Sequence, residues 1–103
     1  MRLISQDGKI DIPYENCVVY VLANYYYNNE KMCSDIAGYI IKAHTGDDYW
    51  DLGEYSTEEK ALCVMEMLQQ QYKRHLTTVF FDAKEGSTFF KFPTDESINE
   101  VSA

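Results

Sequence analysis

Apolar residues recur at helical spacing from Ser56 to His75, which predicts one long amphipathic helix. Ser56 and Glu59 have the spacing of a capping box, so we expect the helix to begin at the serine. Cys63 and Met67 lie four residues apart on the opposite side, either as a self-association surface or as two isolated exposed groups. The stripe expected to be buried consists of Ala61, Met65, Leu68, Tyr72 and Leu76, with Leu62 and Val64 on its shoulders.

Short runs rich in β-branched and aromatic residues flank this helix and predict strands. We expect the run 17–24 to be the central and most buried strand. Asp7 and Gly8 favour a tight hairpin turn, and Pro13 and Pro93 are expected to end the strands before them. The predicted strands are 3–4, 9–12, 17–24, 36–43, 49–53, 77–81 and 88–92.

These elements predict an α+β fold: a single antiparallel β-sheet of about five to six strands with one long amphipathic helix packed on one face. A length of 103 residues with 46% hydrophobic content fits one domain. We expect that domain to cover residues 1–93, and the polar residues 94–103 to form a flexible C-terminal tail.

The cysteine count bounds the chemistry and the compartment. Cys17, Cys33 and Cys63 form no Cys-x-x-Cys pair, so we expect reduced thiols, no metal site and no cofactor. No run of about 18 apolar residues occurs and no apolar signal region follows Arg2, so we expect a cytoplasmic protein without a membrane partner.

The net charge of −8 repels nucleic acid phosphates, so we expect no direct binding to duplex nucleic acid and a preference for basic partners. Four carboxylates precede the helix, at Asp47, Asp48, Asp51 and Glu54. This cluster is a hydrated rim, a carboxylate pair for acid–base catalysis, or an imitation of nucleic acid phosphates that occupies a basic groove on another protein.

Motifs of the common hydrolases and nucleotide enzymes are missing, including a Gly-rich phosphate loop, His-Glu-x-x-His and Gly-x-Ser-x-Gly. Cys17 is expected in a buried strand and Cys63 in mid-helix, which are poor settings for an activated thiolate. We therefore expect no enzymatic activity. Tyr25, Tyr26 and Tyr27 precede a polar turn that can prolong a hairpin beyond the sheet, where they either form a contact surface or cover the sheet edge.

Three segments resemble a group of small uncharacterised proteins found in phages and prophages of Firmicutes. The first is the opening Met-Arg-Leu-Ile-Ser-Gln-Asp-Gly, followed by Asp11, Pro13, Tyr14 and Glu15. The second runs from Leu52 to Ala61, followed by Met65 and Leu68, and the third is Phe-Lys-Phe-Pro-Thr-Asp-Glu at residues 90–96. The resemblance covers about half of the chain and leaves out the tyrosine-rich middle.

The resemblance implies an accessory protein of a bacterial host cell that acts against host defences by binding. One candidate target is a nucleotide-type immune signal, held between the subunits of a homo-oligomer by stacked rings and phosphate-binding cations. The other is a defence protein such as a nuclease, whose basic groove the acidic surface blocks as an anti-CRISPR-like inhibitor does. We rank the ligand hypothesis slightly ahead, and a structural or regulatory phage protein remains an alternative.

The two candidate targets would be bound by different residues. For the nucleotide, the expected phosphate partners are Arg2, Lys9, Lys42 and Arg74, and the expected stacking groups are Tyr25, Tyr27, Trp50 and Phe81. For protein interaction, the expected residues are Asp47, Asp48, Asp51, Glu54, Cys63 and Met67.

Overall fold

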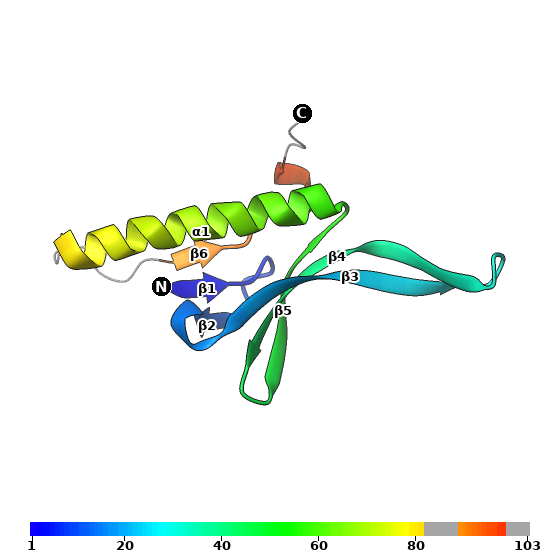
Figure 1. The fold of residues 1–103 in the computed structure, drawn as a ribbon, viewed down its shortest axis with the longest axis horizontal. Helices are drawn as coiled ribbons and strands as arrows, with labels where there is room; N and C mark the ends of the chain where they lie inside the picture. Colours follow the sequence, from blue (N-terminus) through cyan, green and yellow to red (C-terminus); the bar gives the residue numbers. More distant parts are fainter. Residues whose placement is uncertain (82–88, 99–103) are drawn as a thin grey trace.

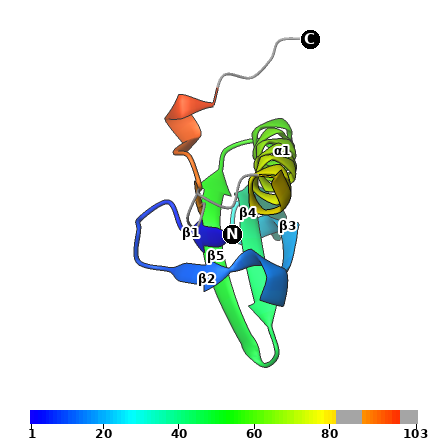
Figure 2. The same cartoon turned by 90° about the vertical axis from the view of Figure 1, so that its left-hand side faces the viewer.

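The computed structural model describes residues 1–81 and 89–98, with backbone only for 78–81. Three layers surround one core (Figures 1 and 2). The helix α1 lies above two sheets, the small sheet and the large sheet. The elements in chain order are β1 (Arg2–Ile4), β2 (Asp11–Pro13), β3 (Val18–Asn28), β4 (Cys33–Thr45), β5 (Asp48–Tyr55), α1 (Glu58–Phe81) and β6 (Phe89–Lys91), with 3-10 turns at Tyr14–Asn16 and Asp95–Ser97.

The α+β class is therefore confirmed, but the expectation of a single antiparallel sheet is wrong. The small sheet has the order β2-β1-β6 and the large sheet β3-β4-β5. β1 pairs antiparallel with β2 and parallel with β6, which follows it by more than eighty residues. The chain divides into two sheets because the turn at Tyr14–Asn16 redirects it after β2, so that β3 pairs only with β4.

The core lies where the two sheets meet α1. Leu3 of the small sheet, Ile41 and Leu52 of the large sheet, and Val64 and Leu68 of α1 are each at most 1% exposed. Burial of such side chains stabilises a fold by about 1.5–3 kcal/mol each. Burial is thus confirmed for Ala61 and Leu68 of the predicted stripe and for Val64 on its shoulder, whereas Met65 and Tyr72 are half-buried.

The margins of that helix face differ from the prediction. Leu62 is 51% exposed and Leu76 is 36% exposed, so neither belongs to the core. Phe90 of β6 borders the opposite flank of α1 at Met67 and Arg74, whereas Leu62 and Leu76 are exposed on theirs.

Both ends of the helix also differ from the prediction. The Thr57 hydroxyl, rather than that of Ser56, accepts the N–H of Lys60 at 3.2 Å, which is the bond of an N-cap. Ser56 is occupied elsewhere, because its N–H and hydroxyl both donate to Asp95. At the other end, α1 continues to Phe81 and contains the segment 77–81 that we predicted as a strand.

We predicted that the run 17–24 is the central and most buried strand, and this prediction is wrong. It belongs to β3, an edge strand of the large sheet, and β4 is the central strand. Val18 and Leu22 are exposed, and no residue of β3 is fully buried. The apolar run suggested a buried central strand because β3 is apolar on both faces. In this chain, only one of those faces is covered.

The tyrosine-rich segment prolongs the β3–β4 hairpin far beyond the body of the protein (Figure 1). We call residues 25–36 the arm. The strands change register between Asn24 and Tyr25, where the arm begins. At its turn the Asn28 side chain donates to Asp35 at 2.8 Å and accepts the N–H of Glu30 at 3.0 Å.

The C-terminal segment does not behave as the predicted tail up to residue 98. Ile98 is buried and joins the core, and Asp95 forms an ion pair with Lys60. Residues 94–98 therefore pack with the domain, while 99–103 lie outside the described residues. No helix within the described part of the chain is long and apolar enough to cross a membrane.

Candidate functional site

The outer face of the large sheet, which points away from α1, is the most distinctive described surface. Ile41 and Ala43 of β4 are fully buried toward the core, so the side chains that alternate with them point outward. We define the outer face by Val18, Tyr20, Leu22, Ile40, Lys42, His44, Tyr49, Asp51 and Glu54, which occupy three cross-strand rows of paired residues.

Apolar and aromatic groups occupy β3 and the end of the face formed by the row Val18, His44 and Tyr49. Val18, Leu22 and Tyr49 are exposed, and the Tyr49 ring stacks on His44 with ring centroids 4.4 Å apart. A partly apolar face of this kind, rimmed by polar groups, is typical of a binding surface.

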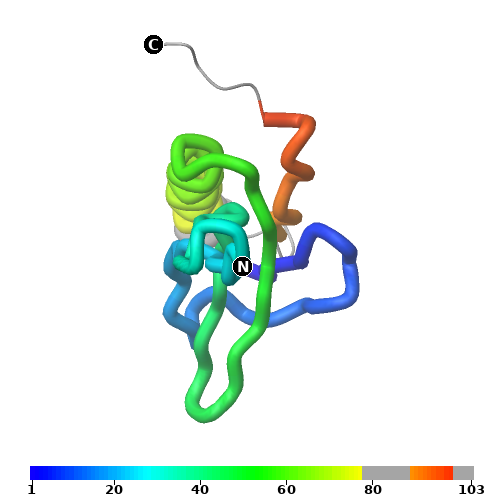
Figure 3. The backbone as a smooth tube through the Cα atoms, turned by 90° about the vertical axis from the view of Figure 1, so that its right-hand side faces the viewer, coloured from blue at the N-terminus to red at the C-terminus, as the bar shows by residue number. Residues whose placement is uncertain are grey.

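Carboxylates occupy the β5 side. Asp51 and Glu54 are exposed on the outer face, and Asp51 forms an ion pair with Lys42 at 3.1 Å. Asp47 and Asp48 are exposed at the β4–β5 turn, which extends away from α1 (Figure 3). The structure thus places all four predicted carboxylates on one hairpin.

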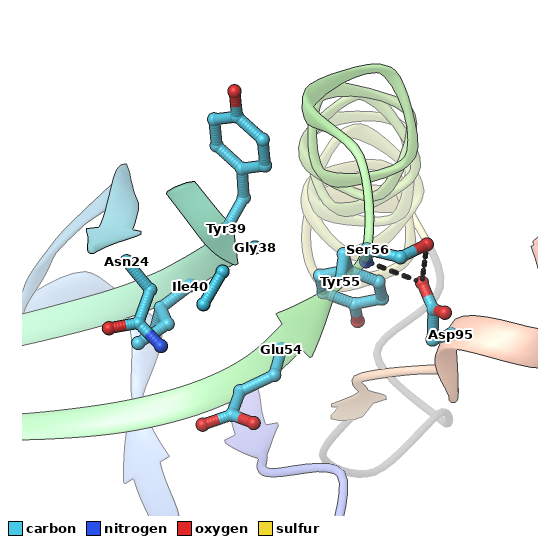
Figure 4. Close-up of a pocket in the computed structure, with 9 residues that line it drawn as sticks. Asn24, Gly38, Tyr39, Ile40, Glu54, Tyr55, Ser56 and Asp95 are labelled. Carbon is cyan, nitrogen blue, oxygen red and sulfur yellow. Dashed lines mark hydrogen bonds between the residues drawn. The ribbon is translucent and has the colours of Figure 1, made fainter. Parts of the chain in front are cut away.

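Two shallow hollows border β5 and share Glu54. The first lies at the base of the arm (Figure 4). The second adds Asp7 and Asp51 to Glu54. No lysine or arginine of the described residues lines either hollow, so both suit a cationic group better than a phosphate. The residues around the first are Asn24, Ala37, Gly38, Tyr39, Ile40, Glu54, Tyr55, Ser56 and Asp95.

A hydrogen-bonded cluster that the sequence analysis missed holds β5 in place. We call it the Gln6 junction: Gln6, Glu54, Tyr55 and Pro93. The Gln6 side-chain amide donates to Pro93 O at 2.8 Å and to Glu54 O at 3.2 Å, and its oxygen accepts the Glu54 N–H at 2.8 Å. The Tyr55 hydroxyl also donates to Pro93 O at 2.8 Å.

Burial and hydrogen bonding shift the pKa values of two side chains at and beside this junction, Tyr55 and Asp95. Burial raises the pKa of Tyr55 far above its ordinary value, so its hydroxyl stays a donor. The Ser56 N–H, which Asp95 accepts, lowers the pKa of that carboxyl, and the Lys60 ammonium adds to the effect. In the sequence, the residues of the Gln6 junction stand out only as part of the segments that resemble the phage proteins. No periodicity of the sequence indicates a contact between Gln6 and Pro93.

The structure does not bring together the cations predicted for a nucleotide within one chain. Arg2 forms an ion pair with Asp11 on the small sheet at 2.8 Å, and Lys42 is paired on the large sheet. Lys9 is exposed in the β1–β2 turn, and Arg74 lines a hollow between α1 and β6.

The predicted stacking groups are separated as well. Tyr25 and Tyr27 lie exposed on the arm, whereas Trp50 is half-buried against the core on the opposite side of the strand from Asp51. The side chain of Phe81 lies outside the described residues.

Cys63 and Met67 do not form a shared exposed surface. Cys63 is half-buried and packs against the core, while Met67 is 41% exposed and lines the hollow with Arg74 and Phe90. A helical wheel does not show this, because Phe90 of β6 lies beside Met67 and only the fold brings β6 next to α1.

Catalytic chemistry gains no support from the described groups. Burial raises the pKa of the Cys17 thiol, which donates to Tyr14 O, and nearby Glu15 adds to the effect; this is the opposite of an activated thiolate. Within the described ranges, no three His, Cys, Asp or Glu side chains lie close enough together to hold a metal ion.

Comparison of the chain with protein-family models, with curated proteins and with solved structures gives no match.

Proposed function

We propose that this protein is a non-enzymatic, phage-type accessory protein that binds and blocks a host defence protein through the outer face of its large sheet. The observation that carries the proposal is that exposed carboxylates and exposed apolar side chains occur together on that face. The counter-defence role follows from the resemblance to phage and prophage proteins and extends it to a surface of this chain.

The composition of the face defines the partner's chemistry. Carboxylates of β5 and of the β4–β5 turn would meet lysine and arginine side chains, which a nucleic-acid-binding groove provides. The apolar side chains of β3 and β4 would form the dry centre of the contact, where interfaces exclude charge. The partner is therefore a protein with a basic surface that normally contacts nucleic acid phosphates.

Sequestration of a nucleotide-type signal has less support in the geometry. Its four cations lie on three separate parts of the chain, and two of them are neutralised by Asp11 and Asp51. Carboxylates line both hollows beside β5, where they would repel a phosphate.

A charge reversal on the outer face tests the proposal. The immobilised wild-type protein should capture a nucleic-acid-binding defence protein from extracts of defence-proficient cells, and the purified partner should lose its nucleic acid binding. Glu54→Lys should weaken this complex at least tenfold, because it puts a cation against the partner's cations. Glu66→Lys, on the exposed back of α1, changes the net charge equally and should leave binding unchanged.

Salt dependence provides a second readout. Affinity of the wild-type complex should fall between 0.05 and 0.5 M salt, because screening weakens exposed charge pairs, and Glu54→Lys should flatten that dependence. Equal affinities for the two lysine variants, or a complex indifferent to salt, would refute binding through this face. Stabilisation by cyclic nucleotides, abolished when Lys42 and Arg74 are replaced, would instead favour the signal hypothesis.

A further inference from the structure

The exposed edge of β3 differs from every other sheet edge in the described residues. β2 and β6 are three residues long, and β2 ends in Pro13. Gln6 covers the edge of β5, since its N–H donates to Leu52 O at 2.9 Å and its side chain bonds both backbone groups of Glu54. β3 is 11 residues long, and none of its residues is charged or a proline.

Such an edge is a template for pairing, and natural proteins usually protect it with charges, prolines or a cover. No described segment other than β4 forms backbone hydrogen bonds with β3. We propose that a second copy of this chain covers it, with the two β3 strands pairing antiparallel about a two-fold axis at Ala23. The large sheets then form one continuous six-stranded sheet. This dimer does not depend on the proposed defence partner.

Charge favours a second copy as the occupant. The chain has a net charge of −8, so most contacts between two copies would bring like charges together. The stretch Val18–Asn28 has no charge, and two copies can approach there without repulsion. A basic segment of another protein would find no carboxylate to pair with along this edge.

The register centred on Ala23 pairs complementary side chains. Paired residues lie equally far on either side of Ala23 in the sequence. Val21 therefore faces Tyr25 of the second copy, and Val19 faces Tyr27 of the second copy. Val19 and Val21 pack on the core side of the sheet, whereas Tyr25 and Tyr27 continue that side onto the arm and are 62% and 57% exposed. Aromatic and β-branched residues are favourable cross-strand pairs.

The uncovered flank of α1 adds to the same surface. Met67 and Arg74 border β6, so Leu62 and Leu76 lie on the other flank, toward the start of β3. Tyr72 marks this direction, since its ring contacts Tyr14 at a centroid distance of 4.8 Å. In Figure 2, β3 lies on the side of the molecule away from the small sheet.

The arm of the second copy would run alongside this flank, because antiparallel pairing places residues 25–28 of one copy beside 18–21 of the other. The tyrosines of each arm then lie beside this flank of the other helix. Leu62 and Leu76 are about 21 Å apart along α1, so the tyrosines can cover only one of them. One two-fold contact thus accounts for the exposed edge of β3 and for the exposed arm tyrosines.

Light scattering and sedimentation of the purified full chain test the oligomeric state, with an expected mass of twice 12.0 kDa. Replacing Tyr25 and Tyr27 together by lysine should raise the dissociation constant roughly 100-fold, since four cross-strand pairs are lost and each is worth about a factor of three to five. The matched control replaces Tyr49 and Phe89 by lysine, which are 61% and 59% exposed but lie outside the β3 contact, and should remain dimeric.

Cross-linking tests the register independently of any loss of stability. In a Cys33→Ser background, Ala23→Cys should be joined between copies by a short bis-maleimide, since the two Ala23 Cβ atoms would lie about 5 Å apart. Val18→Cys should not be joined, because its two copies would lie about 33 Å apart along the paired strands. A monomer at all concentrations, or cross-linking through residue 18 but not 23, would overturn the proposal. A monomer that instead pairs with an added strand peptide would assign the edge to another protein.

Discussion

Replacing Gln6 by alanine tests how the two sheets are held together. The Gln6 side chain forms three hydrogen bonds that connect the β1–β2 turn to β5 and to Pro93. The alanine variant removes all three and leaves the Leu52 O bond to the Gln6 backbone in place. We therefore expect a loss of stability without a change of fold.

The magnitude follows from the lengths and exposure of these bonds. The half-buried bond to Pro93 O and the 2.8 Å bond from the Glu54 N–H should each contribute about 1 kcal/mol net. The 3.2 Å bond to Glu54 O is the longest of the three and adds little. We expect a loss of about 2 kcal/mol in the free energy of unfolding, or roughly 8–16 °C in Tm for a domain of this size.

A double-mutant cycle with Tyr55→Phe sharpens the test. Gln6 and Tyr55 both donate to Pro93 O, so either single variant leaves that carbonyl one donor. The double variant leaves it none, and the cost of a half-buried unpaired carbonyl is added. We expect Tyr55→Phe to cost about 1 kcal/mol and the double variant to exceed the sum by about 1 kcal/mol.

Urea unfolding followed by the fluorescence of Trp50, the single tryptophan, measures all four proteins. The slope against urea should stay constant, which shows that the denatured and native states are unchanged. A loss below about 0.5 kcal/mol for Gln6→Ala, or strict additivity in the cycle, would refute the assignment of the junction as the link between the sheets.

Three further substitutions test the start of α1. Thr57→Ala should lower the unfolding free energy by about 1 kcal/mol, because the Lys60 N–H loses its cap, whereas Ser56→Ala should cost less. Asp95→Asn should cost less than about 1 kcal/mol at pH 7. The folded pKa of Asp95 lies below its unfolded value near 4, so its ionised form stabilises the protein above that value, and the difference from asparagine should vanish as the pH falls through the lowered pKa.

The sequence predicted the parts of the fold that local patterns determine. Periodicity identified the helix and the burial of Ala61 and Leu68, with Val64 at the edge of the predicted stripe. It failed at the helix start, because Ser56 and Thr57 are both good caps and only the contact of Ser56 with Asp95 decides between them. Sheet membership was also out of reach, since the pairing of β1 with β6 depends on residues far apart in sequence.

The candidate surface was predicted in part. The carboxylates from Asp47 to Glu54 lie on one hairpin, as their closeness in sequence suggested. The apolar half of the outer face was not foreseen, because Val18 and Leu22 were assigned to a buried central strand. The cations predicted to bind a nucleotide do not come together in the fold. No local sequence pattern determines how far apart such residues lie, so the sequence could not reveal this.

The error over β3 is informative in itself. A strand that is apolar on both faces and uncharged is typical of the interior of a sheet, and the sequence of β3 has this character along all 11 residues. In one chain it is nevertheless an edge with an exposed arm. Pairing with a second β3 would make it central, in a six-stranded sheet. The strand that sequence reasoning placed at the centre is then central in the assembly, and the proposed dimer explains both its composition and its exposure in the single chain.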